Sequence, residues 1–511
     1  MFEKSSNSFL RLQELVDIIN RLGPTKQQFV SRHMLEEASE SQEALLYRTI
    51  LSTQQPGERA VKKNLPADFN TERYERVKSE LTSILLNLVF VLDLKRAKYS
   101  EYSQRLNELR KAEFLVKTLA SAGARVVAMT IAEEYIVEAR ELEEWSTARE
   151  LISLLRDAAS MAGDGEQVER YTNESNTLFE LLRYEELSLV AQERLTAAFA
   201  SSRSEKPWLK QEVDKALSEL APALHQYKTF KLQWNALRLR KMGLQLEMKY
   251  HEALKITLET DVLLKEYPQF TNRSKRGLNA ATKLMCQVQL QHFKEAFKTV
   301  QSCEENIDKD SNNWFYFKQL QLLLLFRSEQ FNEAKEILRE VLSSKRYNVQ
   351  SESVKQEFQL FLLWADFLTN RPLLAEDWEQ VMMKPGDITK GLLKLLPDLK
   401  DDYTGFKMSV IALEILLLLQ GRRQKRSLIA RIESLKLYRS RHLTGIAGEQ
   451  ASLFIRLLDN LIETDFDPKE AKSISQGVLA DLKKSLADNG LHGGQIMSYA
   501  WLWNKILQTV N

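Results

Sequence analysis

Apolar residues recur every three or four positions along most of the chain, and strict alternation of apolar and polar residues is scarce. This period places apolar side chains on one face of a helix. The short β-branched run GARVVAMTI, at 123–131, continues into a segment with helical spacing, so we interpret it as helix too. No proline occurs between 67 and 206, so nothing interrupts the helical pattern there. The pattern predicts an all-α protein.

One helical segment recurs in the middle of the chain. Each copy has an aromatic residue followed three positions later by alanine: Trp145 and Ala148, Tyr250 and Ala253, Phe293 and Ala296, Phe331 and Ala334. Glutamate directly precedes the alanine in the last three copies, and each copy follows an amphipathic helix after a short polar turn. The aromatic ring can fill the space beside such a turn, and alanine lets the preceding helix approach closely. We therefore predict that each copy begins the second helix of a repeated hairpin.

The stretches YHEAL, FKEAF and FNEAK, with Pro268 in LLKEYPQF, resemble the second-helix half of the tetratricopeptide-repeat-like superfamily. The first helices depart from that pattern, because they lack its tryptophan and small residues at the usual spacing. The resemblance implies a right-handed α-solenoid of antiparallel helix hairpins. It also implies a scaffold for protein–protein interaction rather than a catalyst.

The pattern divides the chain into three parts. We expect an irregular helical N-terminal region at 1–115, tetratricopeptide-like repeats at 116–345, and a C-terminal helical region at 346–511 that continues or caps the solenoid. Prolines and a glycine punctuate 369–402, which indicates short helices and turns before the C-terminal hairpins.

Composition and charge narrow the functional classes. The 511 residues include only 17 glycines and 10 prolines, and the formal net charge is +2, so no general affinity for polyanions follows. The longest leucine tracts are much shorter than a bilayer span, which argues against a membrane partner. The N-terminus has no signal-peptide pattern, and the only two cysteines, Cys286 and Cys303, suit a reducing compartment. We therefore expect a cytoplasmic protein.

The sequence contains few residues or motifs that are candidates for catalysis or for cofactor binding. The six histidines do not share metal-ligand spacing on one helix, and no HExxH sequence occurs. Cys303 continues the apolar stripe of its helix, which is typical of a buried thiol. No glycine-rich phosphate loop or nucleophile elbow is present. We expect no enzyme activity, no cofactor and no metal.

Two groups of residues are candidates for partner binding. The resemblance implies that the first helices of the hairpins line a concave groove, and its candidate residues are Asn235, Arg238, Tyr316, Gln319 and Arg327. Ordinary packing and surface roles are the alternative for these five.

The second group is basic. The segment 421–442 contains Arg422, Arg423, Lys425, Arg426 and Arg431, with Glu433 as its one acidic residue. Such a patch can contact nucleic acid or an acidic protein tail. In the alternative interpretation it complements acidic faces of neighbouring helices.

Two functions follow as hypotheses. The first is a non-catalytic cytoplasmic scaffold that binds a protein or peptide through its concave face. The second is a regulatory protein that binds nucleic acid through 421–442 or through the N-terminal helices.

Overall fold

The computed structural model describes residues 41–53, 57–66, 69–91, 101–201, 208–370, 406–420, 425–442, 445–491 and 495–510, and a few positions near the N-terminus. The described residues form helices joined by turns, with no strand among them, which confirms the predicted all-α class. The chain divides into two compact units, Met1–Asn176 and Thr177–Asn511, and the boundary falls inside α9 (Gly165–Ser201).

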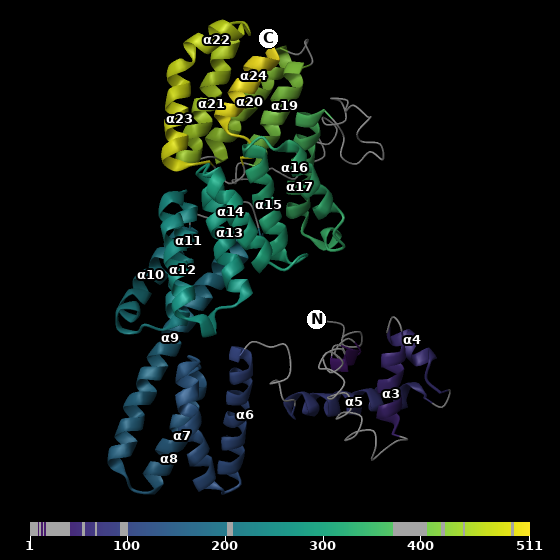
Figure 1. The fold of residues 1–511 in the computed structure, drawn as a ribbon, viewed down its shortest axis with the longest axis vertical. Helices are drawn as coiled ribbons and strands as arrows, with labels where there is room; N and C mark the ends of the chain where they lie inside the picture. Colours follow the sequence, from purple (N-terminus) through teal and green to yellow (C-terminus); the bar gives the residue numbers. More distant parts are fainter. Residues whose placement is uncertain are drawn as a thin grey trace. The chain divides into compact units, whose positions relative to one another are not determined.

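The first unit begins with α3 (Gln42–Ser52), α4 (Glu58–Lys63) and α5 (Thr71–Val91) (Figure 1). Ser41 caps α3, because its hydroxyl accepts a hydrogen bond from the backbone N–H of Ala44. The three helices enclose a small apolar core that includes Leu46 and Tyr74. At its edge the buried ammonium of Lys78 pairs with Glu75 at 2.6 Å.

The same unit contains α6 (Glu101–Ser121), α7 (Arg125–Glu141) and α8 (Trp145–Met161), and each packs against the next. Buried alanines on α7, such as Ala132, allow close approach to its neighbours. Arg105 on α6 joins the first two helices, because it donates to both carboxylate oxygens of Glu138 on α7 at 2.6 and 2.9 Å.

The second unit continues with helices that again pack in chain order. They are α10 (Trp208–Gln226), α11 (Phe230–Leu246), α12 (Tyr250–Glu266), α13 (Arg273–Gln289), α14 (Phe293–Asn306), α15 (Asn312–Arg327), α16 (Phe331–Leu342) and α17 (Glu352–Thr369). Two short 3-10 turns, Pro268–Phe270 and Tyr347–Val349, follow α12 and α16. Each short connection reverses the chain, so α11, α13 and α15 run in the same direction.

A single turn geometry connects several of these hairpins. The residue two positions before each aromatic has a positive φ: Glu143 at 53°, Met248 at 57°, Gln291 at 59° and Glu329 at 61°. The next residue donates its N–H to the carbonyl five positions back, as His292 does to Gln287 at 2.8 Å. The aromatic then begins the helix, and the four alanines that follow are fully buried. The predicted helix starts and packing alanines are confirmed.

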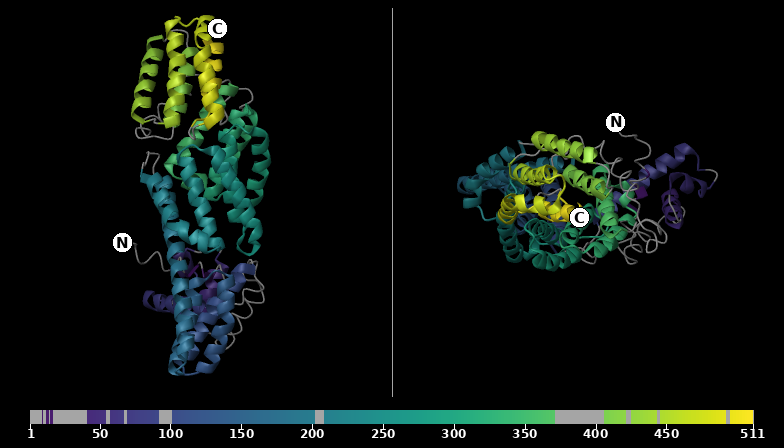
Figure 2. Two further views of the ribbon diagram at one scale, coloured as in Figure 1. Left: turned by 90° about the vertical axis from the view of Figure 1, so that its left-hand side faces the viewer. Right: turned by 90° about the horizontal axis from the view of Figure 1, so that it is seen from above.

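The C-terminal helices of this unit are α19 (Phe406–Gln420), α20 (Lys425–His442), α21 (Gly445–Glu463), α22 (Pro468–Ile474), α23 (Gln476–Asn489) and α24 (Tyr499–Val510). They lie side by side as a bundle (Figure 2), in which α24 packs against α19, α21, α22 and α23. Leu491, just after α23, contacts the hairpins: its N–H donates to the carbonyl of Gln289 on α13 at 2.9 Å.

The predicted three-part division stays a prediction. Its boundary at residue 115 lies inside α6, and residue 345 lies in the turn after α16. The handedness of the solenoid also stays a prediction. Among the described helices, none combines the length and the apolar composition that crossing a bilayer requires.

Candidate functional site

The first helices of successive hairpins, α11, α13, α15 and α17, form the surface on which most of the predicted groove residues lie. We call it the first-helix surface. Within it α15 packs against both α13 and α17. The N-cap side chains of Thr229, Asn272, Ser311 and Ser351 each accept a backbone N–H at the start of one of these helices, which fixes where each helix begins.

Tyr316 lies on α15, the helix of this surface that packs against both α13 and α17. It is 43% exposed, although its neighbours Phe315 and Phe317 are buried. Burial of its hydroxyl among protein atoms raises the pKa of Tyr316 well above its usual value, and Cys286, Glu357 and Cys303 contribute to the same shift.

Two of the predicted groove residues on these helices have amide side chains. Gln319, one turn after Tyr316 on α15, donates to a carboxylate oxygen of Glu357 on α17 at 2.5 Å. Asn235 on α11 donates to the hydroxyl of Ser188 on α9 at 2.9 Å. Both amides thus have an internal partner and still keep hydrogen-bonding capacity, because an amide offers two donor hydrogens and an acceptor oxygen.

Arg238 is the predicted residue with the most unusual environment. It is partly buried on α11, and within the described part of the chain its guanidinium has no hydrogen-bond or ion-pair partner. Burial lowers the pKa of Arg238. Lys275 on α13 is similar: burial, then Lys231 and Arg238, lowers its pKa. Its ammonium lies 5.7 Å from the ring centroid of Phe230.

A buried polar network lies beside Arg238, and the sequence analysis did not identify it. Lys241 is 4% exposed. Its Nζ donates to Asn279 on α13 at 2.8 Å and to Thr260 on α12 at 3.3 Å. Asn279 in turn donates to Asp261 at 2.6 Å. Lysine at 241 and asparagine at 279, both in otherwise apolar stripes, are the sequence signals that would have indicated this network.

Lys241 has a strongly shifted titration. Burial, and then the nearby charge of Arg238, lowers its pKa to about 7, while Asp261 and Cys286 oppose the change. A buried ammonium stays charged where anions and hydrogen-bond acceptors compensate its lost hydration. Here the compensating groups are mainly neutral, which explains why the uncharged amine is favoured.

Arg327 lies away from this surface. It is 8% exposed at the end of α15. Its guanidinium donates to the carbonyl of Val288 at 3.2 Å, to the side-chain oxygen of Gln289 at 2.9 Å and to the carbonyl of Gln495. The structure thus places Arg327 in the interior, where it joins the hairpins to the backbone at Gln495, shortly before α24.

The basic segment is only partly described, since Arg422 and Arg423 lie outside the described residues and the side chain of Lys425 is not described either. Arg426 is exposed. Arg431 pairs with Glu414 on α19 at 2.6 Å. Lys436 pairs with Asp459 on α21 at 2.9 Å. These pairs match the alternative in which the segment complements acidic neighbouring helices.

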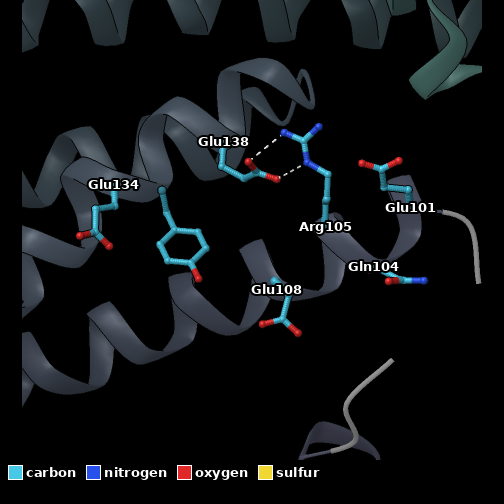
Figure 3. A pocket seen from close by; sticks show the side chains of 7 residues that line it. Glu101, Gln104, Arg105, Glu108, Glu134 and Glu138 are labelled. Atoms are coloured by element: carbon cyan, nitrogen blue, oxygen red, sulfur yellow. Dashed lines mark hydrogen bonds and ion pairs between the residues drawn. The ribbon is translucent and has the colours of Figure 1, made fainter. Parts of the chain in front are cut away.

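The first unit has a pocket of about 480 Å³ between α6 and α7. Figure 3 shows Arg105 bound to Glu138 at its wall, with the carboxylates of Glu101, Glu108 and Glu134 around it. The second unit has a pocket of about 670 Å³ between α10, α11 and α12, whose lining mixes apolar side chains such as Val213 and Ile256 with charged ones. The lining of this pocket contains both acidic and basic side chains, so it favours neither an anionic nor a cationic ligand.

The described residues offer little for catalysis. They contain no group of three or more histidine, cysteine, aspartate or glutamate side chains placed to hold a metal ion. Cys286 and Cys303 are buried free thiols, and burial raises the pKa of each to about 12, which disfavours the nucleophilic thiolate. His251 and His292 lie near one another at adjacent turns, with ring centroids 6.1 Å apart.

Comparisons of the chain with family models, with curated proteins and with solved structures find no match. The resemblance to tetratricopeptide-like repeats therefore rests on the residues that carry it. The function must be argued from the first-helix surface itself.

Proposed function

We propose that this chain is a non-catalytic cytoplasmic scaffold that holds an extended segment of a partner protein along the first-helix surface. The observation that carries the proposal is Tyr316, an aromatic side chain that is 43% exposed on α15 although its neighbours Phe315 and Phe317 are buried. Aromatic residues in such positions are frequent anchors for protein partners. The two free thiols, Cys286 and Cys303, agree with a reducing compartment.

The neighbours of Tyr316 support an extended occupant. Gln319 and Asn235 lie on the same surface, and their amides can bind the backbone N–H and C=O groups of a bound chain. Successive helices of similar direction repeat such groups along a row, as a stretched peptide requires. We infer that these hairpins form a right-handed, tetratricopeptide-like solenoid, because the turn, the aromatic and the buried alanine recur together.

Nucleic-acid regulation through 421–442 or through the N-terminal helices is the alternative function. It has less support, because Arg431 and Lys436 of the described part are engaged by carboxylates of neighbouring helices. A phosphate backbone is bound by exposed cations, which displace the counterions condensed on the nucleic acid.

A selection from a random peptide library with the full chain as bait tests the scaffold proposal. We expect enrichment of a defined peptide motif, and loss of that enrichment in Tyr316→Ala. Val262→Ala is the matched control, because Val262 is 55% exposed on the second helix α12. Selection of no motif, or equal enrichment by Tyr316→Ala, would contradict the proposal.

A further inference from the structure

Three cations converge on one part of the first-helix surface. Lys231 and Arg238 lie seven positions apart on α11, and this spacing puts them on the same face of the helix. Lys275 lies on α13. The hydrogen bond of 2.8 Å from Lys241 to Asn279 sets the register between these two helices. Arg238 lies about one turn before Lys241, and Lys275 lies about one turn before Asn279. Because α11 and α13 run in the same direction, Arg238 and Lys275 therefore lie opposite one another.

The shifted pKa values agree with this placement. Lys275 has a lowered pKa because of burial and then because of Lys231 and Arg238, so the three charges repel one another. Further along α11, Lys241 has a lowered pKa to which Arg238 also contributes. The carboxylate of Asp261 reaches this network, but it already accepts from Asn279 at 2.6 Å and from Lys283 at 3.2 Å.

Two buried lysines elsewhere in the second unit face carboxylates. Lys318 pairs with Glu340 at 2.8 Å, and Lys335 pairs with Asp366 at 3.6 Å. By contrast, neither Arg238 nor Lys275 has a carboxylate partner among the residues that the structure describes. Bringing unpaired like charges out of water is unfavourable unless an anion compensates them. The anion missing here would have to come from outside the chain.

We propose that Arg238 and Lys275, with Lys231 at the edge, bind an oxyanion carried by the extended partner segment, either a side-chain carboxylate or a phosphoryl group. The proposal rests on the proposed function, since the oxyanion would lie in the same surface as Tyr316. A peptide fits better than a nucleic acid, because the two cations are partly buried and form one compact site. A phosphodiester backbone instead requires a row of exposed cations.

Direct binding tests the proposal. Peptides from the selection are labelled and measured by fluorescence anisotropy in three versions, with glutamate, glutamine or phosphoserine at each acidic position. We expect the double variant Arg238→Gln, Lys275→Gln to weaken the acidic or phosphorylated version by at least about tenfold. The glutamine version should bind weakly to both proteins. Lys298→Gln, which removes an exposed charge from the second helix α14, should change nothing. Preference for glutamate or for phosphoserine identifies the oxyanion.

The outcomes separate this inference from the proposed function. Selected peptides that are neutral and insensitive to the double variant would overturn the oxyanion site and leave the scaffold intact. Competition of the peptide by a single-stranded oligonucleotide with higher affinity would overturn the peptide as occupant. If no peptide is selected, inorganic phosphate serves as the probe. Thermal stabilisation by phosphate that the double variant abolishes would support the oxyanion site alone, and equal stabilisation of both proteins would overturn it.

Folding of the variants supplies an independent check. Because Lys231 and Arg238 repel Lys275, the single change Lys275→Gln should leave the melting temperature unchanged or raise it. A melting temperature lowered by more than the loss of the contact with the Phe230 ring explains would show that Lys275 has an anionic partner within the chain, which contradicts the proposal.

Discussion

At the scale of single residues, the chain keeps charged side chains in three different environments. Lys335 and Asp366 are buried as a pair. Arg327 is buried among carbonyl and amide oxygens. Lys241 is buried mainly among neutral groups, with the like charge of Arg238 nearby. As a consequence its pKa is about 7 instead of 10.5. The environment decides whether a buried cation stays charged.

Lys241 predicts a specific dependence of stability on pH. In the folded chain its pKa is about 7, and the ordinary pKa of an exposed lysine is 10.5. Between these values the unfolded chain binds the additional proton, so the free energy of unfolding should rise with pH, by up to about 1.4 kcal/mol per pH unit. Below about pH 7 both states are protonated, and this contribution is constant. Lys241→Met should remove the rise.

Urea denaturation of the wild type and Lys241→Met at several pH values measures this difference. The comparison is kept below about pH 9, because buried Cys286 and Cys303 have raised pKa values and oppose the trend above the ordinary thiol range. Other groups that face Lys241, namely Arg238 and Asp261, remain in both proteins. Parallel stability profiles for the two proteins would contradict the assignment.

At the scale of elements, a common turn organises the hairpins. In two turns the residue with positive φ is glycine, namely Gly123 at 84° and Gly163 at 75°. In the four turns that precede an aromatic it is Glu143, Met248, Gln291 or Glu329. A side chain in this left-handed region costs about 1 kcal/mol relative to glycine. The non-glycine turns therefore carry a small strain that the packing of the adjoining helices offsets.

Reciprocal substitutions at this position test the strain. Gln291 is exposed, so Gln291→Gly should change mainly the backbone energy and raise the free energy of unfolding by about 1 kcal/mol. Gly123→Ala should lower it by a similar amount, and space does not interfere, because no atom lies within 4 Å of the added Cβ. Chemical denaturation measures both. A destabilised Gln291→Gly variant would show that the turn is not strained.

At the scale of the whole molecule, Gly490, Leu491 and Gln495 join the C-terminal bundle of the second unit to its hairpins. Gly490 lies so close to α13 that a Cβ atom there would meet the carbonyl oxygen of Gln289 at 2.8 Å. Its own carbonyl accepts from Gln450 on α21 at 3.0 Å. Shortly before α24, the N–H of Ile496 donates to the hydroxyl of Ser409 on α19 at 3.1 Å. The contacts of Gly490 and Leu491 with Gln289 thereby hold the C-terminal bundle against the hairpins.

Gly490→Val should weaken this junction. The φ of 75° disfavours a β-branched residue, and the contact with Gln289 adds a steric clash, so we expect a loss of about 2 kcal/mol or more. Hydrogen–deuterium exchange should show loss of protection at the amides of Leu491 and Ile496. Gly445→Ala is the control, because Gly445 has a φ of 55° with no atom within 4 Å. It should cost about 1 kcal/mol and leave these amides protected. Unchanged exchange in Gly490→Val would contradict the role of the junction.

Some of the fold could be predicted because it depends on local rules. The starts of α8, α12, α14 and α16 at Trp145, Tyr250, Phe293 and Phe331 follow from a turn, an aromatic and an alanine within a few residues. The candidate site was predictable only in part. Asn235, Arg238, Tyr316 and Gln319 do lie on first helices, but Lys275 and Lys241 were missed, and Arg327 is interior.

The sequence by itself determined the helical class, the hairpin turns and the apolar face of each helix, because these depend on residues a few positions apart. Only the tertiary structure decided which charges have partners. Lys241 meets Asn279 across 38 positions, and Arg327 meets Gln495 across 168. The helical period shows on which face a cation lies, but not which helix that face will meet. Arg327 is therefore enclosed by acceptors, while Arg238, an arginine of similar sequence context, faces Lys275 and needs an anion from outside the chain.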